Sequence, residues 1–305
     1  MARYLAARLG HGVLVTLAVL SVAFVLLHLA GDPTYLLVPV GASPEEIQNI
    51  RHQLGLDQPL WRQYVNYMKR ALRGDLGTSL RYNQPVLGLV LERFPATMKL
   101  TAVALAVMLI VAVPLGVVSA VKRNGAFDQI ATGLALLGQS MPTFWFGIVL
   151  ILVFGVSLRW FPTSGSEGWR ALVLPGVTLG GYTAGLTTRM VRSCLIEVLG
   201  QDYIRTARAK GLAERMVLYK HALRNAALPV VTIVGYQLST LIGGALVTEQ
   251  IFGYPGMARL AVQAINNRDF PVVQAFVVVA AVTVLVINLV VDLMYVLLDP
   301  RITYE

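Results

Sequence analysis

Apolar stretches long enough to cross a lipid bilayer recur along this chain and constrain its fold more than any other feature. A transmembrane helix needs about 20 predominantly apolar residues to cross about 30 Å of hydrocarbon. Six such stretches cover residues 9–30, 98–120, 129–158, 171–192, 227–248 and 272–298. Because backbone polar groups inside a bilayer must be satisfied within the protein, the sequence predicts an all-α integral membrane protein with about six transmembrane helices.

The composition supports lipid as the main solvent. Of the 305 residues, 56% are hydrophobic and only 13% are charged, whereas a soluble domain carries about 25% charged residues. In a soluble protein the net charge of +9 would suggest nucleic-acid binding. Here the placement of the charges explains the excess, so we expect no nucleic-acid partner.

Basic residues concentrate on one side of the predicted membrane. Arg3 and Arg8 precede the first stretch, Lys122 and Arg123 follow the second, and the loop between the fourth and fifth is the most basic segment. The positive-inside rule therefore places both termini in the cytoplasm. The first stretch has the basic start of a signal peptide, but it is too long and lacks a cleavage site, so we expect it to be retained.

Residues 31–97 read as a separate, water-facing helical segment outside the cytoplasm, with acidic and basic residues in similar numbers. Residues 43–46, Ser-Pro-Glu-Glu, predict a capping box with proline at the first helical position. Asp57 is positioned to cap a second helix, which Gly74 would end. The chain thus divides into an N-terminal span over 1–30, this extracytoplasmic segment, and a transmembrane core over 98–305.

The loop over residues 193–226 differs from a simple connector. It has helical periodicity on both sides of Gly211, and basic residues outnumber acidic ones. A helix–glycine–helix on the cytoplasmic face suits docking into a groove of another protein. Binding to anionic lipid headgroups would also explain the charge. It would not explain the small residues Ala207 and Ala209, which would let a partner approach the backbone.

Motifs along nearly the whole chain carry a family resemblance. The loop reads DYIRTARAKGL at 202–212 and KHALRNA at 220–226, followed by Pro229. The other motifs are AGDP at 30–33, LGLDQP at 54–59, GDLGTS at 74–79, SMPTFW at 140–145, VTEQIFGYPG at 247–256, RDFPVVQA at 268–275 and NLVVDLMY at 288–295. Together they resemble permease subunits of ATP-binding-cassette importers, specifically the dipeptide/oligopeptide/nickel class and its first-permease, dipeptide permease B-like type.

Two departures from the general permease pattern matter. Aligning the loop on Gly211 places Arg205, Thr206 and Ala207 over the family's Glu-Ala-Ala, so the role of that glutamate does not transfer. This variant is typical of the peptide class. Ala258 stands where the class usually has glycine, which affects expectations for the turn around residues 255–260.

The resemblance implies a transport subunit of the bacterial inner membrane that catalyses no reaction itself. Its implied partners are a second homologous permease, two ATP-hydrolysing subunits, an external substrate-binding protein and the lipid membrane. ATP and Mg would bind the partner ATPases, with no cofactor or metal on this chain. The ATPases would bind the loop over residues 193–226, here called the coupling loop. The contact residues would be Tyr203, Arg205, Thr206, Ala207, Arg208, Lys210 and Gly211.

Polar residues inside spans are candidates for the translocation pathway because they are costly there. In the fifth span, Gln237, Thr240, Gly244 and Thr248 recur at steps of three or four and share one face. Gln139 and Ser140, at a weak point of the third span, are further candidates. Helix–helix hydrogen bonding is the alternative role for all of them. For Asn288 and Asp292 we expect that structural role, with Asp292 pairing with Arg189 or Arg192.

Alternatives remain at two levels. Within the class, the cargo is expected to be dipeptides or oligopeptides, with glutathione-like peptides, nickel or a metal chelate as alternatives. Outside the class, an ion-gradient-driven secondary transporter or a membrane enzyme would also be apolar. Secondary transporters usually show internal repeats and ionisable groups at mid-membrane. The sequence shows neither feature, and no catalytic arrangement.

Overall fold

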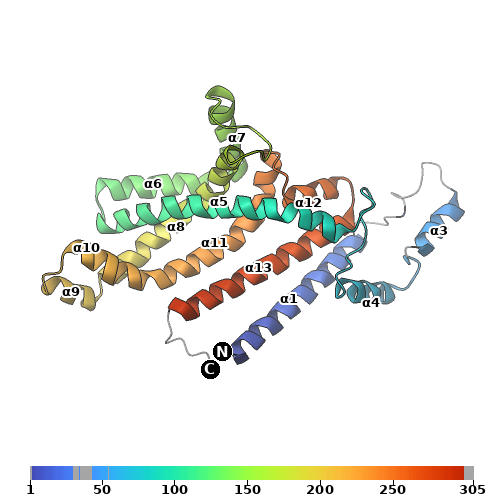
Figure 1. The fold of residues 1–305 in the computed structure, drawn as a ribbon, viewed down its shortest axis with the longest axis horizontal. Coiled ribbons are helices and arrows are strands. Elements are labelled where there is room, and N and C mark those ends of the chain that lie inside the picture. The colour runs from blue at the N-terminus through green and yellow to red at the C-terminus, as the bar shows by residue number, and fades with distance from the viewer. Residues whose placement is uncertain (1, 30–33, 35–42, 54, 299–305) are drawn as a thin grey trace. The chain divides into compact units, whose positions relative to one another are not determined.

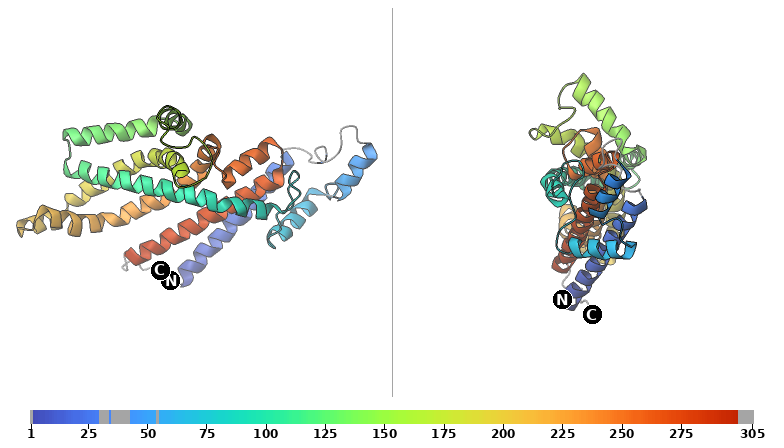
Figure 2. Two further views of the ribbon diagram at one scale, coloured as in Figure 1. Left: turned by 45° about the horizontal axis from the view of Figure 1, so that its top comes forward. Right: turned by 90° about the vertical axis from the view of Figure 1, so that its right-hand side faces the viewer.

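A computed structural model describes residues 2–29, 34, 43–53 and 55–298 (Figures 1 and 2). Every element in this part of the chain is a helix, and an isolated β-bridge pairs Thr78 with Pro85. The helices are α1 (Ala2–Leu29), α3 (Pro44–Gln53), α4 (Leu60–Ala71), α5 (Val86–Val121), α6 (Ala126–Ser140), α7 (Thr143–Leu150), the π-helix η1 (Ile151–Ser157), α8 (Arg170–Leu199), α9 (Asp202–Ala209), α10 (Glu214–Met216), the π-helix η2 (Val217–Ala222), α11 (Leu223–Ile251), α12 (Met257–Asn266) and α13 (Phe270–Leu298).

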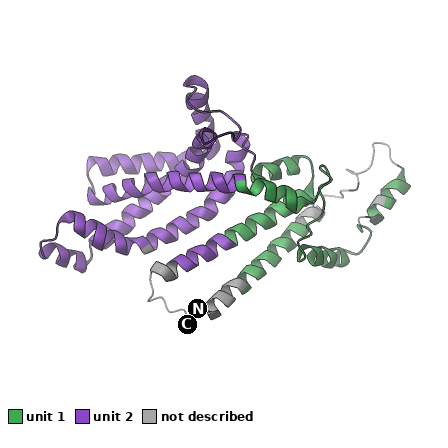
Figure 3. Ribbon diagram, viewed as in Figure 1, with its two compact units in different colours: residues 1–95, 256–285 green, residues 96–255, 286–305 purple. Residues whose placement is uncertain are grey.

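The chain forms two compact units, residues 1–95 with 256–285 and residues 96–255 with 286–305 (Figure 3). The first unit has a core of aliphatic residues from five of its helices or their flanks. These are Leu20, Leu76, Val86, Val90, Met257, Leu260, Ala264, Val272 and Ala275. Helix α4 packs on α1 through aromatic contacts, with Phe24 lying 5.3 Å from the Tyr64 ring and 5.6 Å from the Tyr67 ring.

Local signals in the 31–97 segment are mostly confirmed. The Ser43 backbone N–H donates to Glu46 at 2.8 Å, and the Glu46 N–H donates to the Ser43 hydroxyl at 3.3 Å, which is the reciprocal pair of a capping box. Gly74 follows α4 with φ +80°, as a helix-ending glycine should. The prediction for Asp57 is wrong, because α4 starts after Pro59 without a side-chain cap and Asp57 pairs with His52 at 2.6 Å. The AGDP motif lies outside the described residues.

The second unit contains three closely packed helices, with α8 beside both α6 and α11 (Figures 1 and 2). Glycines of α8 allow close approach to α6 and also to α5. A Cβ on Gly180 would lie 2.3 Å from the Ala104 carbonyl oxygen of α5, and one on Gly185 would lie 2.5 Å from the Ala135 carbonyl oxygen of α6. Glycines of α8 therefore let its backbone pack closely against both α5 and α6.

Within the described residues, three helices are long and apolar enough to cross a membrane, namely Val86–Val121, Pro229–Ile251 and Phe270–Met294. The number rises to four if α6 and the continuous α7–η1 segment are counted as one span, but the axes of these two segments are bent by 103°. The predicted span over 129–158 is therefore divided into two helices. The bend falls at the predicted weak point, because Pro142 forces Met141 into an extended conformation with ψ 129°.

The segment after the fifth span contains a helix that periodicity over so short a stretch did not reveal. Helix α12 buries Met257, Ala258, Leu260, Ala261 and Ala264 along one face. Ala258 is only 1% exposed and sits inside this helix. Alanine is a better helix former than glycine, so its presence at this position favours the local structure.

Candidate functional site

The coupling-loop region folds as a helix–glycine–helix, as predicted. Helix α9 ends at Ala209, and Gly211 turns the chain with φ +72°. Its N–H donates to the Arg208 carbonyl at 2.9 Å. Across the turn, Arg208 Nε donates to Glu214 Oε1 at 2.6 Å. The turn therefore depends on a left-handed residue, which glycine adopts without a Cβ penalty.

One face of α9 is buried within the chain itself. Ile204 is fully buried and Ala207 is 6% exposed. They belong to a small core, here called the loop core, formed by Ala120 of α5, Leu195 of α8, Ile204 and Ala207 of α9, Val217 and Ala222 of η2, and Ala226 of α11. The Tyr203 hydroxyl also accepts from Asn225 Nδ2 at 2.8 Å, which ties α9 to the start of α11.

The opposite face of α9 is uncovered. Its residues are Tyr203, Arg205, Thr206, Arg208 and Ala209, continued by Lys210 and Gly211. The structure thus separates the predicted coupling residues into a buried member, Ala207, and an exposed group. Ala209 is the small residue that lies on the surface, whereas Ala207 packs inward.

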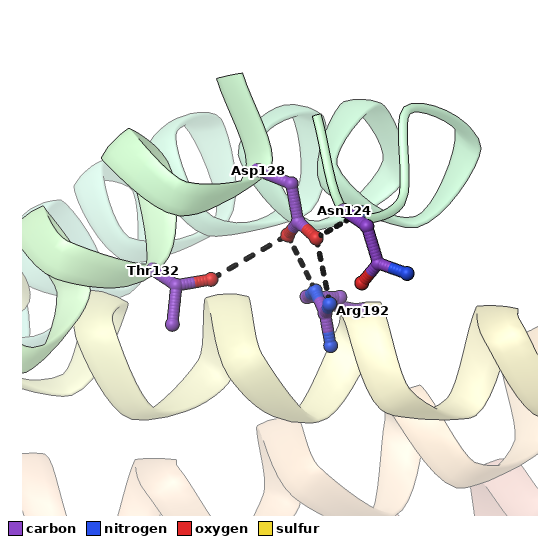
Figure 4. A network of polar contacts seen from close by, with 4 residues as sticks. All are labelled: Asn124, Asp128, Thr132 and Arg192. Carbon is purple, nitrogen blue, oxygen red and sulfur yellow. Dashed lines mark hydrogen bonds and ion pairs between the residues drawn. The ribbon is translucent and has the colours of Figure 1, made fainter. Parts of the chain in front are cut away.

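A buried polar network joins the start of α6 to α8 (Figure 4). Arg192 Nε donates to Asp128 Oδ1 at 2.6 Å and Arg192 Nη2 donates to Asp128 Oδ2 at 2.7 Å. The Asn124 backbone N–H also donates to Asp128 Oδ2, at 2.9 Å, and the Thr132 hydroxyl lies 3.5 Å from Oδ1. Arg192 lies one helical turn before Leu195 of the loop core, so the network holds the end of α8 from which the loop departs.

This network corrects one expectation and supplies a missed residue. Asp292 was expected to pair with Arg189 or Arg192, but Arg192 pairs with Asp128 and Arg189 Nη1 donates to Gln139 Oε1 at 3.2 Å. Asn288 does make an interhelical contact, from the Ser239 hydroxyl at 3.5 Å. The sequence signal that could have found Asp128 is an acidic residue at one end of the predicted third span, on the same side of the membrane as the basic residues at the end of the predicted fourth span.

The pathway candidates fall into two groups in the structure. Gln139, Gln237 and Thr240 come together around a cavity of about 100 Å³, which Tyr182 and Tyr236 also line. Gly244 and Thr248 lie further along α11; Thr248 is buried and donates to the Gly244 carbonyl at 3.3 Å. Ser140 is exposed at the end of α6, and its hydroxyl donates to the Leu136 carbonyl at 2.8 Å.

Burial distinguishes these residues further. Gln237 is 1% exposed and donates to the Thr187 hydroxyl at 3.3 Å, which is a contact between α11 and α8. Tyr236 is 68% exposed, and Thr240 is partly exposed one turn further along α11. The uncovered face of α11 therefore follows Tyr236, Thr240, Gly243, Val247 and Gln250. Thr240 is a predicted pathway residue that also lies on this uncovered face.

Nearby, Glu249 is a fully buried carboxylate. It accepts a hydrogen bond from the Thr97 hydroxyl at 2.6 Å. This bond satisfies part of the hydrogen-bonding capacity of the carboxylate and links α11 to α5. The pKa of the adjacent Tyr254 phenol is raised by burial and by the Glu249 charge. These contacts indicate a structural role at the end of α11.

Comparison with known proteins gives a consistent result over the whole chain. Residues 112–304 match the family described as binding-protein-dependent transport system inner membrane component, and residues 1–101 match the N-terminal family of such membrane components. The chain is 41% identical to the glutathione transport system permease protein GsiC of Escherichia coli over 296 residues, covering 96% of this chain and 97% of that protein. The corresponding protein of Shigella boydii is 40% identical over the same length.

Solved structures show the same fold. The inward-facing MetNI methionine ABC transporter matches 69% of this chain and 96% of its own chain, with a TM-score of 0.61 and 21% identity. An amino acid ABC transporter crystallised with histidines matches 68% of this chain and 93% of its own, with a TM-score of 0.53 and 15% identity. At these identities the likeness concerns the fold alone.

Proposed function

The chain belongs to the family of binding-protein-dependent transport system inner membrane components, and from this membership we propose that it forms half of the channel through which short peptides are imported. It is a multi-pass permease subunit of an ATP-binding-cassette importer of the peptide/nickel class, in a bacterial inner membrane. It does not catalyse a reaction itself, and the family implies ATPase and binding-protein partners. This family assignment excludes the alternative of an ion-gradient-driven secondary transporter.

The observation that carries the peptide cargo is the 41% identity to a glutathione permease over almost the full length of both chains. Glutathione is a peptide-like molecule, and the aligned region covers 96% of this chain. Nickel or a metal chelate is the alternative within the class. The descriptions of the relatives favour a peptide.

For the membrane arrangement, we propose six spans with both termini in the cytoplasm. Helices α5, α11 and α13 supply three spans by length and apolarity, and α1, the bent α6–α7 pair and α8 supply the others. Basic residues on α9 and its flanks support a cytoplasmic position for the coupling loop. A second homologous permease would complete the channel.

For coupling, we propose that an ATPase subunit grips the exposed face of α9. Arg205, Arg208 and Lys210 offer positive charge there, and the exposed small residues Thr206 and Ala209 allow close approach. ATP and Mg would be held by the ATPases. Movement of α9 would pass through the loop core to α5, α8 and α11, because all four helices contribute side chains to that core.

For the passage, we propose that Thr240 and the neighbouring uncovered face of α11 contact the moving cargo. Gln139 supports this face from the bend between α6 and α7, since both residues line the same small cavity. On its buried side, this part of α11 packs against the rest of the chain at Gln237, Gly244 and Thr248. Ser140 lies at the exposed end of α6.

The test is uptake by the complete complex, reconstituted in vesicles with its ATPases and external binding protein. Radiolabelled glutathione, a dipeptide, a longer peptide and nickel are offered separately, with and without ATP. ATP-dependent uptake of one or more of the peptides supports the proposal. Uptake of nickel alone, or uptake driven by an ion gradient without ATP, contradicts it.

A further inference from the structure

The first unit contains a cavity that the transport mechanism described above does not use. Its volume is about 570 Å³, which lies within the about 300–1,000 Å³ typical of small-molecule sites. Helix α4 forms one wall, the loop after it forms another, and Phe24 of α1 and Gln274 of α13 close it. Every lining residue belongs to the first unit.

The charge of this cavity is positive. Lys69, Arg70 and Arg73 line it together with a single acid, Asp75. Arg70 Nε donates to Asp75 Oδ2 at 2.9 Å, so this pair is internally neutral. Within the described part of the chain, Lys69 and Arg73 have no ion-pair partner. The cavity therefore offers two cations to an incoming anion.

A buried hydroxyl in the wall lacks a partner. Tyr64 and Tyr67 lie one turn apart on α4, and both rings contact Phe24. The Tyr64 hydroxyl is 2.7 Å from the Ser21 hydroxyl, whereas the Tyr67 hydroxyl is buried with no hydrogen-bond partner in the described residues. Burial raises the pKa of the Tyr67 phenol to about 12, so it remains a donor at neutral pH. Its oxygen has less than 1 Å² of accessible surface, so a ligand in the cavity would contact the Tyr67 ring and not the hydroxyl.

The rest of the lining combines amides with apolar surface. The side chains of Gln58, Asn66 and Gln274 provide amide groups, and Phe24, Leu56 and Leu76 provide apolar contacts. A diacyl lipid would need an apolar exit for its chains in addition to a headgroup site. A compact molecule with an anionic end and amide groups along its length fits these walls better.

We propose that this cavity is a binding site for a short peptide with a free carboxylate, held by Lys69 and Arg73. The choice of a peptide rests on the proposed import function, whereas the anion preference rests on the cavity alone. The charge bias places this segment outside the cytoplasm, so the site would hold cargo on the permease beside the external binding protein. Charge-assisted hydrogen bonds supply most of the affinity.

The experiment uses the complete permease–ATPase complex in phosphatidylcholine nanodiscs, without the external binding protein. Calorimetry measures binding of trialanine and of trialanine amide, which differ at the terminal carboxylate. Trialanine should bind at least tenfold more tightly than its amide. The double substitution Lys69→Gln/Arg73→Gln should weaken trialanine binding about tenfold or more, and Tyr67→Phe should leave it unchanged.

Two controls make the result specific. Arg62→Gln removes a cation from the same helix outside the cavity and should leave binding unchanged. Tyr67→Phe deletes an unsatisfied hydroxyl, so without peptide it should unfold at the same temperature as the wild type or a higher one.

Other outcomes distinguish a peptide from a lipid as the anionic ligand of the cavity. Equal binding of trialanine and its amide, or unchanged binding in the double variant, overturns the proposal. No response to trialanine, together with phosphatidylglycerol that copurifies with the wild type but not with the double variant, would assign the cavity to lipid instead. If peptide uptake proceeds normally while the double variant has lost binding, the import function stands without this site. If only nickel is imported while trialanine still binds, the proposed cargo fails and the site stands.

Discussion

Arg192 and Asp128 form a bidentate ion pair between α8 and α6, with both nitrogen–oxygen distances below 2.8 Å. The Asp128 side chain is 4% exposed and that of Arg192 is 25% exposed. Removing one partner of a buried pair leaves an uncompensated charge, which costs about 3–5 kcal/mol. Arg192 reaches partly into solvent, so we expect the lower end of this range for Asp128→Asn.

A double-mutant cycle checks this prediction. Arg192→Met and Asp128→Asn should each lower the thermal stability of the assembled complex, and the double variant should lose much less than the two effects added together. Strict additivity would show that the two side chains do not interact. Arg189→Met, on the same helix, provides the matched control and should have a small effect.

Substitution of Gly211 tests the turn of the coupling loop. Its φ is +72°, and a Cβ added there would meet no heavy atom within 4 Å. The cost of Gly211→Ala is therefore backbone strain alone, about 1–2 kcal/mol. We expect normal assembly and reduced substrate-stimulated ATP hydrolysis, measured in reconstituted complexes. Gly211→Asn should retain most of the activity, because asparagine tolerates this conformation; equal loss in both variants would point away from strain.

Two alanines of α9 should respond differently to the same change. Ala207→Glu places a carboxylate in the loop core, where burial of an unpaired charge is prohibitive, so the amount of folded complex should fall. Ala209→Glu places it on the exposed face. That variant should assemble normally and lose ATPase stimulation and uptake together. Full stimulation in Ala209→Glu with normal subunit stoichiometry would contradict docking on this face.

The α11 face is tested by Thr240→Phe. The threonine is partly exposed beside the small cavity, so the larger ring should reduce uptake at least tenfold while leaving assembly unchanged. Gln237→Ala is a useful contrast, because it removes a buried contact to Thr187 at 3.3 Å and should mainly lower stability. Normal uptake by Thr240→Phe would place the passage elsewhere.

The pair formed by Asp75 and Arg70 predicts a dependence on pH. Hydrogen bonds from Arg70 and from the Gly77 N–H lower the pKa of the Asp75 carboxyl below its usual value. A carboxyl whose pKa is lowered by folding stabilises the folded state above its unfolded pKa of about 3.9 and loses that contribution as pH falls through the folded value. The difference in unfolding temperature between wild type and Asp75→Asn should therefore be constant from about pH 5 to 8 and shrink below about pH 4.

Structural features formed by residues close in sequence were predicted well in this chain. Ser43 and Glu46 lie three residues apart and form the expected capping box, and Gly211 adopts the turn conformation that its position indicated. These features depend on neighbours in sequence. The break of the third span was likewise visible in Pro142, although its angle of 103° was not.

Features that depend on tertiary partners were not predictable in the same way. Asp57 had a suitable position for a cap, but His52 competes for its carboxylate. Asp128 and Arg192 lie 64 residues apart, and nothing in the sequence selects that pair over others. The inward direction of Ala207 follows from the packing of α5, α8 and η2 around α9, which the periodicity of one short helix does not determine.

The two faces of α9 also have a consequence for divergence among related importers. The inward residues, such as Ile204, must fit the ends of three long helices, so changes there are constrained by folding. The outward residues are exposed, and their side-chain contacts include the Arg208–Glu214 ion pair and the Tyr203–Asn225 hydrogen bond. With the proposed docking on this face, ATPase preference would drift by surface substitution on this helix, and a duplicated permease could acquire a different motor subunit while its channel stays intact.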